Sequence, residues 1–414
     1  MPRSMLKQKA VKRSQITPRV LIIGGGFAGI TAANKLAELS SLGEVNITLI
    51  SDKTYFEYYP AFYRVVTGAP ANEVCIPLTD MVSKEVDIVV DCISAIDLKN
   101  KTVTGSGVGS KSHTYTADYI ILAIGSETIY FDLPGLKEHS FGFKSIAEAH
   151  ELKNHIESLF KTKSEKPSDM VSNFQVVIVG GGPSGVEVAG DLTQNMQKLA
   201  KQYSIDPSFI TIDIIDRGNR LIGATHPHAS AAALKRLRSL GVNVFLNREV
   251  MAEDIEKILM GDMSLKTKTV IWTAGTSVNA LFKKTEGLQF TEKRRVLIDD
   301  YLEVPNFPNV YVAGDGAGTK FSGLAQTAIR DGKFVAKDIL KKIRNGNSAQ
   351  NINRKKYEAK DVEYIIPIGR NWAIMSLGPI HIFGYFAYVA RELVDFFYFA
   401  TTLSFRKTWQ LFWR

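Results

Sequence analysis

Two glycine-rich loops with the same internal spacing occur in this chain, each directly after a short run of aliphatic residues. The first spans Val20–Gly29 and the second spans Val176–Gly185, and both read G-x-G-x-x-G. A stretch with helical spacing follows each loop. A strand, such a loop and a helix form the dinucleotide-binding unit of a Rossmann fold, in which the helix N-terminus receives the pyrophosphate. Two units predict a protein that holds two dinucleotides at once, as hydride transfer between them requires.

The three glycines of each loop have separate physical roles. The first allows the tight turn out of the strand, the second lets the backbone approach a pyrophosphate, and the third lets the helix pack on the strand. In this order they are Gly24, Gly26 and Gly29 in the first loop, and Gly180, Gly182 and Gly185 in the second. The alternative for either loop alone is an ordinary strand-to-helix turn.

An acidic residue near the end of the following strand supports both units, because it can bind the ribose hydroxyls. Thr211–Asp216 reads as a strand that ends in Asp216, and Val45–Asp52 places Asp52 near the end of its strand. A carboxylate at position 216 repels a 2′-phosphate, which favours NADH over NADPH. Arg217 directly after it keeps NADPH open as an alternative.

Cysteine content excludes several classes of protein. The 414 residues contain two cysteines, Cys75 and Cys92, which form no C-x-x-C pair and no cluster with histidine. This pattern excludes a disulfide framework and a zinc site, and we expect no metal ligands. It also argues against flavoenzymes that relay electrons through closely spaced cysteines. A reducing intracellular compartment is the simplest interpretation.

The positive charge of the chain is uneven. Lysine and arginine total 51 against 42 acidic residues, a formal charge of +9, and residues 1–19 carry basic side chains but no acidic one. This segment is interpreted as a solvated tail, with an arm for anionic lipid or a transit peptide as alternatives. The basic residues are not interleaved with a nucleic-acid-binding motif, so no nucleic-acid partner is expected.

The order of predicted elements indicates an α/β fold in which one Rossmann-like domain is inserted into another, each with a three-layer parallel sheet. Buried strands are predicted at Tyr119–Gly125 and Val310–Asp315, a capping box at Ser145–Glu148, a polar linker at Lys161–Ser172 and a helix at Leu324–Ile343. By analogy, the N-terminal loop belongs to the permanently held flavin. The expected segments are a basic extension (1–18), an FAD domain in two parts (19–150 and 291–369), an NADH domain (151–290) and an aromatic C-terminal segment (370–414).

An ordered series of short motifs resembles the type II NADH:quinone oxidoreductases over about residues 18–370. Besides the two loops, the motifs are Tyr58–Gly68, Leu122–Ser126, Phe143–Ala149, Gly182–Gly190, Ile271–Gly275, Val312–Asp315 and Leu324–Ala328. The resemblance implies a single-subunit flavoprotein that takes a hydride from NADH onto FAD and passes the electrons to a membrane quinone without pumping protons.

The resemblance also implies roles for individual residues. FAD would lie on the first loop and near Gly125, Gly314 and Asp315, with Asp315 bonding the ribityl chain. Gly275 would pass close to the flavin and nicotinamide rings. Glu187 would steer protons during quinone reduction, beside a quinone site that includes Ala325 and Gln326. Asp315 can alternatively be a turn former, and Glu187 an acid that stabilises a helix N-terminus.

Two positions depart from the family pattern. The acid after the first loop normally falls where Ser51 stands, and the second glutamine of the quinone motif is replaced by Arg330. The alternatives are therefore an oxidoreductase like apoptosis-inducing factor or ferredoxin reductase, or a redox sensor that binds FAD and NADH and turns over slowly.

The C-terminal segment is rich in aromatic residues. It holds three of the four tryptophans, Trp372, Trp409 and Trp413, and charged residues at 391, 392 and 395 interrupt the apolar stretch Pro379–Ala400. Those charges disfavour a spanning helix and favour an amphipathic helix that lies on a bilayer. The alternative is a helix packed on the flavin domain or in a homodimer. We expect a peripheral enzyme on the cytoplasmic face of the plasma membrane, with the mitochondrial inner membrane as an alternative.

Overall fold

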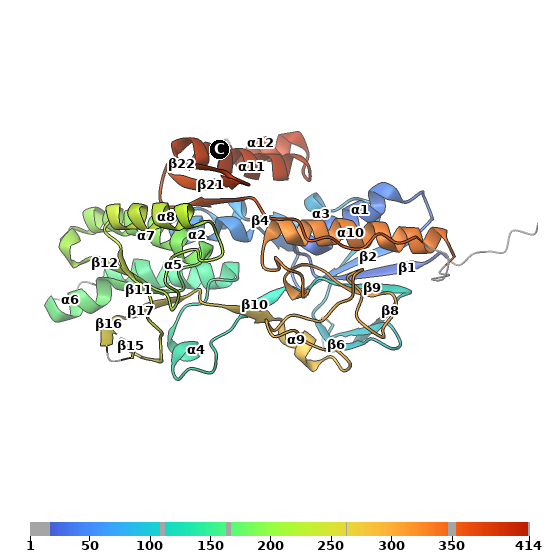
Figure 1. Cartoon of the computed structure of the whole chain (residues 1–414), viewed down its shortest axis with the longest axis horizontal. Coiled ribbons are helices and arrows are strands. Elements are labelled where there is room, and N and C mark those ends of the chain that lie inside the picture. Colours follow the sequence, from blue (N-terminus) through green and yellow to red (C-terminus); the bar gives the residue numbers. More distant parts are fainter. Residues whose placement is uncertain (1–16, 108–111, 163–166, 262, 347–352, 413–414) are drawn as a thin grey trace, which may run out of the picture.

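The computed structural model describes residues 17–107, 112–162, 167–261, 263–346 and 353–412. Two parallel sheets stand side by side, and a C-terminal unit lies across both of them (Figure 1). The residues drawn in grey include the first 16, so most of the expected basic extension lies outside the described part of the chain.

The first sheet combines strands from distant parts of the sequence. Its order is β19-β9-β1-β2-β5, and every neighbouring pair is parallel. The strands are β1 (Arg19–Ile23), β2 (Asn46–Ser51), β5 (Val86–Val90), β9 (Tyr119–Leu122) and β19 (Val310–Val312). Because β19 pairs with β9, the chain returns to the first sheet after completing the second.

The second sheet repeats the pattern of the first. Its order is β13-β12-β11-β17, again with parallel neighbours. The strands are β11 (Gln175–Val179), β12 (Thr211–Ile215), β13 (Asn243–Phe245) and β17 (Thr269–Trp272). Continuous buried apolar runs such as Val176–Val179 are typical of parallel strands covered on both faces.

Both loops turn as their glycines predict. Gly24 and Gly180 have φ angles of 111° and 114°, a region that glycine enters without steric cost. A Cβ on Gly24 would lie 2.3 Å from the carbonyl oxygen of Ala123, the residue directly after β9. Helices α1 (Phe27–Leu39) and α7 (Pro183–Tyr203) then begin directly after the second glycine of each motif. The strand–loop–helix pattern predicted from the sequence is confirmed in both units.

Shorter elements connect the two sheets and cover their ends. Strands β10 (Ser126–Thr128) and β18 (Thr276–Val278) form an antiparallel ribbon. Antiparallel hairpins and sheets are formed by β3 (Tyr55–Glu57) with β4 (Cys75–Pro77), by β6 (Ile93–Asp97), β7 (Thr102–Gly105) and β8 (His113–Thr116), and by β14 (Ala252–Asp254), β15 (Lys257–Met260) and β16 (Met263–Lys266). The remaining helices of the two units are α2 (Phe62–Val66), α3 (Leu78–Met81), α4 (Leu136–His139), α5 (Ile146–Lys161), α6 (Pro167–Phe174), α8 (Pro227–Ser239), α9 (Ala280–Lys284) and α10 (Ala325–Arg344).

The capping box at the start of α5 is confirmed. The Ser145 side chain accepts from the Glu148 amide, and the Glu148 carboxylate accepts from the Ser145 amide.

The predicted linker at Lys161–Ser172 is wrong in its second half, because α6 begins at Pro167. Helix α6 buries Phe174 against Phe160 of α5, an apolar contact that the polar composition of the segment conceals.

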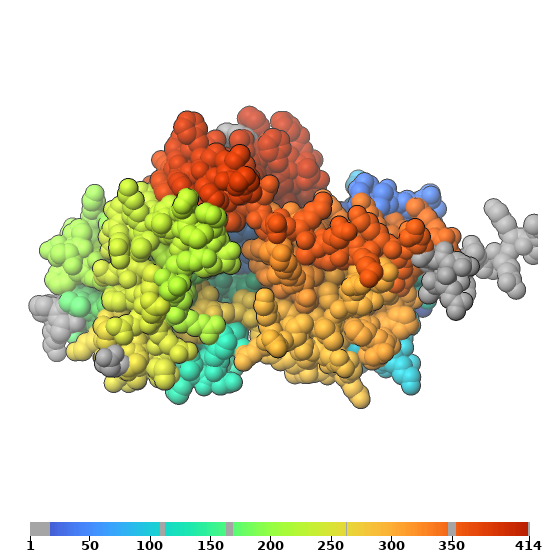
Figure 2. Space-filling model, viewed as in Figure 1, coloured from blue at the N-terminus to red at the C-terminus, as the bar shows by residue number. Residues whose placement is uncertain are grey.

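The C-terminal unit is a three-stranded antiparallel sheet followed by two helices. The sheet contains β20 (Tyr364–Pro367), β21 (Ala373–Leu377) and β22 (Ile380–Gly384), and the helices are α11 (Tyr385–Ala400) and α12 (Phe405–Phe412). The prediction of one helix over Pro379–Ala400 is wrong for its first residues, which pair with β21. In Figure 2 this unit rests on both of the units below it.

Candidate functional site

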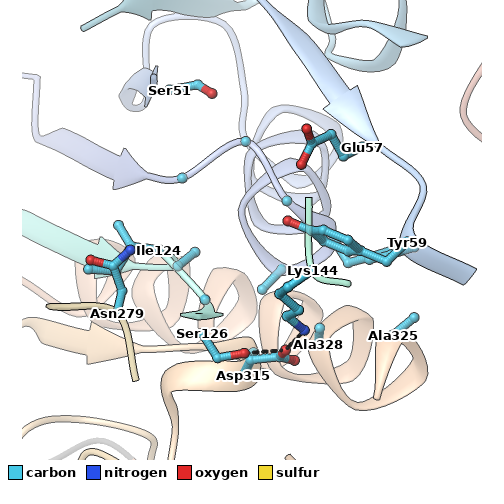
Figure 3. Close-up of a pocket in the computed structure, with 18 of the residues that line it drawn as sticks. Ser51, Glu57, Tyr59, Ile124, Ser126, Lys144, Asn279, Asp315, Ala325 and Ala328 are labelled. Carbon is cyan, nitrogen blue, oxygen red and sulfur yellow. Dashed lines mark hydrogen bonds and ion pairs between the residues drawn. The ribbon is translucent and has the colours of Figure 1, made fainter. Parts of the chain in front are cut away.

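A cavity of about 520 Å³ joins the two dinucleotide units. The first loop, the end of β2, the ribbon strand β10 and the start of α10 line most of it, and Pro183, Ser184 and Glu187 of α7 reach it from the second unit. Figure 3 shows polar side chains that enter it from several elements. Its volume falls within the roughly 300–1,000 Å³ of small-molecule and cofactor sites.

The cavity gathers most of the residues expected to bind FAD. Gly24, Gly26, Asp52, Gly125, Gly314 and Asp315 all line it. A Cβ on Gly26 would meet no atom within 4 Å, so this glycine faces open space at the N-terminus of α1. Gly29 instead packs inside the unit, where an added Cβ would lie 1.9 Å from the Gly24 carbonyl oxygen.

Asp315 is tied to two partners across the cavity. Its Oδ2 accepts from Ser126 Oγ and from Lys144 Nζ, each at 2.9 Å (Figure 3). Burial acts to raise the pKa of Asp315, but the Lys144 ammonium and the hydrogen bonds outweigh it and hold this pKa below its usual range. Asp315 is therefore negatively charged inside the cavity. A residue that only formed a turn would not need this charge.

At the end of β2, Ser51 stands where the acid after the first loop is usually found, as the sequence indicates. Ser51 is buried at the strand end, and its hydroxyl accepts from the Lys53 amide at 3.2 Å. Asp52, one residue later, is exposed and borders the cavity. Lys53 forms an ion pair of 2.8 Å with the buried Glu57. In place of the usual ribose-binding acid, the chain therefore has the Ser51 hydroxyl at the strand end and the Asp52 carboxylate one residue later.

The cavity lining includes Pro183 and Ser184 of the second loop, but not the three glycines of its motif or Asp216. Asp216 follows β12, and its carboxylate accepts from the amides of Gly181 and Gly218, both at 2.6 Å. Gly182 has no atom within 4 Å of an added Cβ, as at Gly26 in the first loop. Gly185 packs closely, with an added Cβ 1.8 Å from the Gly180 carbonyl oxygen. The two loops thus share one geometry.

Glu187 lies where α7 meets the cavity. It is in the second turn of α7, whose first turn holds no acid, so the alternative of an acid at the helix N-terminus is not supported. Burial raises the pKa of Glu187 to about 8, against the attraction of Arg391. Its carboxyl group is therefore mostly protonated at neutral pH and can hold a proton at the cavity wall.

Two further predicted residues, Gln326 and Gly275, also lie outside the cavity lining, as does Arg330, which replaces the second glutamine of the quinone motif. Gln326 is exposed in the first turn of α10, although its neighbour Ala325 lines the cavity. Gly275 lies in the turn before β18, where an added Cβ would be 3.0 Å from the Phe131 ring. Arg330 donates to the carbonyl oxygens of Lys360 and Asp361, at 3.2 and 3.4 Å, and so holds the chain between α10 and β20.

The partners of the site residues were not predicted from the sequence. Lys144 occurs in a motif noted above, but nothing in its local pattern indicates an ion pair with Asp315. Helix α11 also contributes, because Arg391 and Asp395 form a buried ion pair of 3.2 Å. Arg391 donates to the Pro60 carbonyl oxygen at 3.0 Å, and the Tyr58 hydroxyl donates to Asp395 at 2.5 Å. The charged residues that interrupt the apolar stretch therefore face the protein.

Two dinucleotide-type loops around one cavity define a flavoprotein oxidoreductase fold, and comparisons agree. Residues 18–332 match the model of the pyridine nucleotide-disulphide oxidoreductase family. The type II NADH:quinone oxidoreductase NdhA of Mycobacterium tuberculosis is 30% identical over 92% of this chain and 83% of its own length. The type II NADH:quinone oxidoreductase of Staphylococcus aureus is 26% identical over 81% of this chain and 85% of its own length.

Solved structures agree on the fold. The structure of NDH2 from Plasmodium falciparum in complex with NADH superposes with a TM-score of 0.84 at 18% identity, over 96% of this chain and 97% of that one. A sulfide:quinone oxidoreductase from Aquifex aeolicus superposes with a TM-score of 0.77 at 20% identity, over 96% and 95%. The chain belongs to the pyridine nucleotide-disulphide oxidoreductases and, within them, to the type II NADH:quinone oxidoreductases.

Proposed function

We propose that this flavoprotein oxidises NADH through bound FAD and delivers both electrons to a quinone that it meets at a membrane surface. One observation carries the proposal. One cavity is lined by the first glycine loop and Asp315 on one side, and by Pro183 and Ser184 of the second loop and Glu187 of α7 on the other. This arrangement brings two dinucleotide sites into contact with one enclosed space.

The residues of the first unit fit FAD. Gly26 leaves open space at the N-terminus of α1, where unpaired amides and the helix dipole favour a pyrophosphate. Asp315 provides a carboxylate for hydroxyl groups of the ribityl chain, and Ser51 and Asp52 stand near the adenosine ribose position. FAD, when bound, supplies the chemistry of accepting a hydride and passing electrons on.

The residues of the second unit fit NADH. Gly182 offers the same open position for a pyrophosphate at the start of α7. Two backbone amides orient the Asp216 carboxylate, which suits ribose hydroxyls and repels a 2′-phosphate. We therefore favour NADH over NADPH, although Arg217 follows directly.

Glu187 and Ala325 are the residues that we assign to the quinone side of the cavity. Glu187 holds a proton at neutral pH, which suits protonation of a reduced quinone oxygen. Gln326 is exposed one residue beyond Ala325, where it can meet a quinone only at the cavity rim. Arg330 is engaged with backbone carbonyls and is assigned no part in quinone binding.

The C-terminal unit presents an apolar face that supports attachment to a membrane. Exposed large apolar side chains gather at the end of β21 and on β22, α11 and α12, and Phe386 is 80% exposed. They are Leu377, Ile380, Ile382, Phe383, Tyr385, Phe386, Val389, Leu393, Val394, Phe397, Phe405 and Trp409. Among the described residues no helix is long and apolar enough to span a bilayer. We therefore propose that α11 and α12 lie on a bilayer, at the cytoplasmic face of a plasma membrane or on a mitochondrial inner membrane.

Steady-state assays test the proposed activity. The purified protein, with its flavin identified after release, is mixed with NADH and either a short-chain quinone or ferricyanide. Rapid NADH oxidation with the quinone is expected. Turnover with ferricyanide alone would instead favour an oxidoreductase like ferredoxin reductase, and flavin reduction without turnover would favour a redox sensor.

A further inference from the structure

Helix α7 carries a second carboxylate one turn beyond Glu187. Asp191 follows Glu187 by four residues, so the two side chains lie on the same face of the helix, with Cβ atoms about 5–6 Å apart. Glu187 lines the cavity, whereas Asp191 lies outside the lining and is half-buried. Asp191 therefore stands between the cavity wall and the outside of the protein.

Polar groups from three elements surround Asp191. Its Oδ2 accepts from Thr67 Oγ1, at the end of α2, at 3.3 Å. Arg64 of α2 and Arg370 of the β20–β21 connection act on its carboxylate electrostatically. Arg64 is itself paired with Glu392 of α11, and both of these side chains are partly exposed. Asp191 and the charged pair Arg64–Glu392 are thus all partly exposed to solvent.

Quinone reduction by NADH requires a proton from water. In the overall reaction, NADH, one proton and a quinone give NAD⁺ and a quinol, so the hydride supplies both electrons and one of the two hydrogens. The second hydrogen enters as a proton in every turnover. Once Glu187 has given its proton to the quinone oxygen, it must be reprotonated from outside the cavity.

The neighbouring acids differ in how well they can supply Glu187 with a proton. Asp395 of α11 is 2% exposed and is held by Arg391 and the Tyr58 hydroxyl. Asp191 has a hydroxyl partner and is only half-buried, so water can reach it more easily than Asp395. We propose that Asp191 is a positioning residue that passes protons from water to Glu187 during quinone reduction. This inference rests on the proposed function of the same cavity.

The charges around both acids agree with such a role. Burial raises the pKa of Asp191 against the effects of Thr67, Arg64 and Arg370, and burial also raises the pKa of Glu187. The groups that face the two acids are Tyr63 and Arg64 of α2, Arg370 after β20, and Tyr388, Arg391, Glu392 and Asp395 of α11.

Substitution Asp191→Asn tests the relay. We expect quinone-limited turnover to fall at least tenfold and its solvent deuterium isotope effect to rise, with partial rescue by small weak acids such as formate. Ferricyanide takes electrons without protons, so NADH–ferricyanide turnover should stay within twofold. Asp191→Glu should restore quinone turnover. Asp87→Asn, which removes an exposed carboxylate on β5, serves as the matched control.

The possible results distinguish a failure of the relay from a failure of the proposed function. Wild-type turnover, pH profile and isotope effect in Asp191→Asn would overturn the relay while leaving the proposed function intact. Equal losses with quinone and ferricyanide would assign Asp191 a purely structural role and overturn it as well. Absence of quinone turnover in the wild-type protein would contradict the proposed function itself.

Discussion

Glu187 combines a place on the cavity wall with a carboxyl group whose pKa burial raises to about 8. The acid form is present below this pH and is lost as the pH rises through it. Glu187→Gln should lower quinone-limited turnover by about 100-fold, the scale of general acid–base catalysis. It should also abolish the fall of the wild-type rate above about pH 8. Steady-state rates measured against pH check both points, and an unchanged rate and profile would remove Glu187 from the mechanism.

Glu253 on β14 gives a test of stability rather than activity. Its side chain is 8% exposed, its Oε2 has no hydrogen-bond partner among the described residues, and burial raises its pKa to about 8. The folded protein therefore keeps this proton over a pH range in which the unfolded chain has released it. Unfolding then releases a proton, so this group lowers the free energy of unfolding as the pH rises from about 4.5 to 8.

Glu253→Gln should remove this pH dependence. Relative to the wild type, we expect the variant to gain roughly 1–3 kcal/mol of stability on going from about pH 5 to pH 9. Denaturant unfolding at the two pH values measures the difference. A stability difference that is the same at both would show that Glu253 ionises as easily in the folded protein as in the unfolded chain.

Single residues also show how far sequence reasoning reaches. The loop glycines were predictable because G-x-G-x-x-G describes the local geometry of one turn. Asp315 was predictable from its motif, but its partner Lys144 comes from a segment far away in the sequence, and no local pattern connects them. The same holds for Arg391 and the Pro60 carbonyl oxygen, which meet only after α11 has folded back onto the first unit.

At the level of elements, α11 has two faces of different character. Ala387, Arg391, Asp395 and Phe399 follow each other at four-residue intervals and are buried against the protein. The exposed face carries Phe386, Val389, Leu393 and Phe397. The sequence predicted an amphipathic helix but not this orientation, because it gave no sign that the charged face has partners within the same chain.

This exposed face predicts binding to lipid vesicles. Substituting Phe386 and Phe397 together by aspartate should weaken binding by on the order of 100-fold or more, because each buried aromatic side chain contributes about 1.5–3 kcal/mol. Sedimentation with anionic vesicles measures the bound fraction. Leu42→Asp is the control, since Leu42 is fully exposed on the loop after α1, away from the C-terminal unit. Equal sedimentation of the double variant and the control would contradict membrane attachment through α11.

Other elements show why parts of the prediction failed. The run that became β22 is apolar, and a short apolar run does not distinguish a strand from a helix; only pairing with β21 decides it. The stretch before β11 is polar in composition, yet α6 packs Phe174 against α5. The mean polarity of a segment does not reveal such a contact, because a helix needs only one apolar face to pack against its neighbours.

On the scale of the whole molecule, the order of the motifs along the chain predicted the architecture better than any single motif. Strand β19 rejoins the first sheet beside β9, which agrees with a flavin domain in two parts. The predicted domain limits remain a prediction, and the limit at residue 150 falls inside α5 (Ile146–Lys161). The C-terminal unit covers both other units, an arrangement that depends on tertiary packing and has no local signal (Figure 2).

We propose that electrons pass from NADH to flavin to quinone through the cavity shared by the two units. Anaerobic rapid mixing of the flavin-loaded protein with NADH, followed by a quinone, tests it most directly. We predict that NADH bleaches the flavin absorbance and that the quinone restores it, with one quinone reduced for each NADH oxidised. Flavin that NADH does not reduce, or reduced flavin that persists in the presence of quinone, would contradict the account.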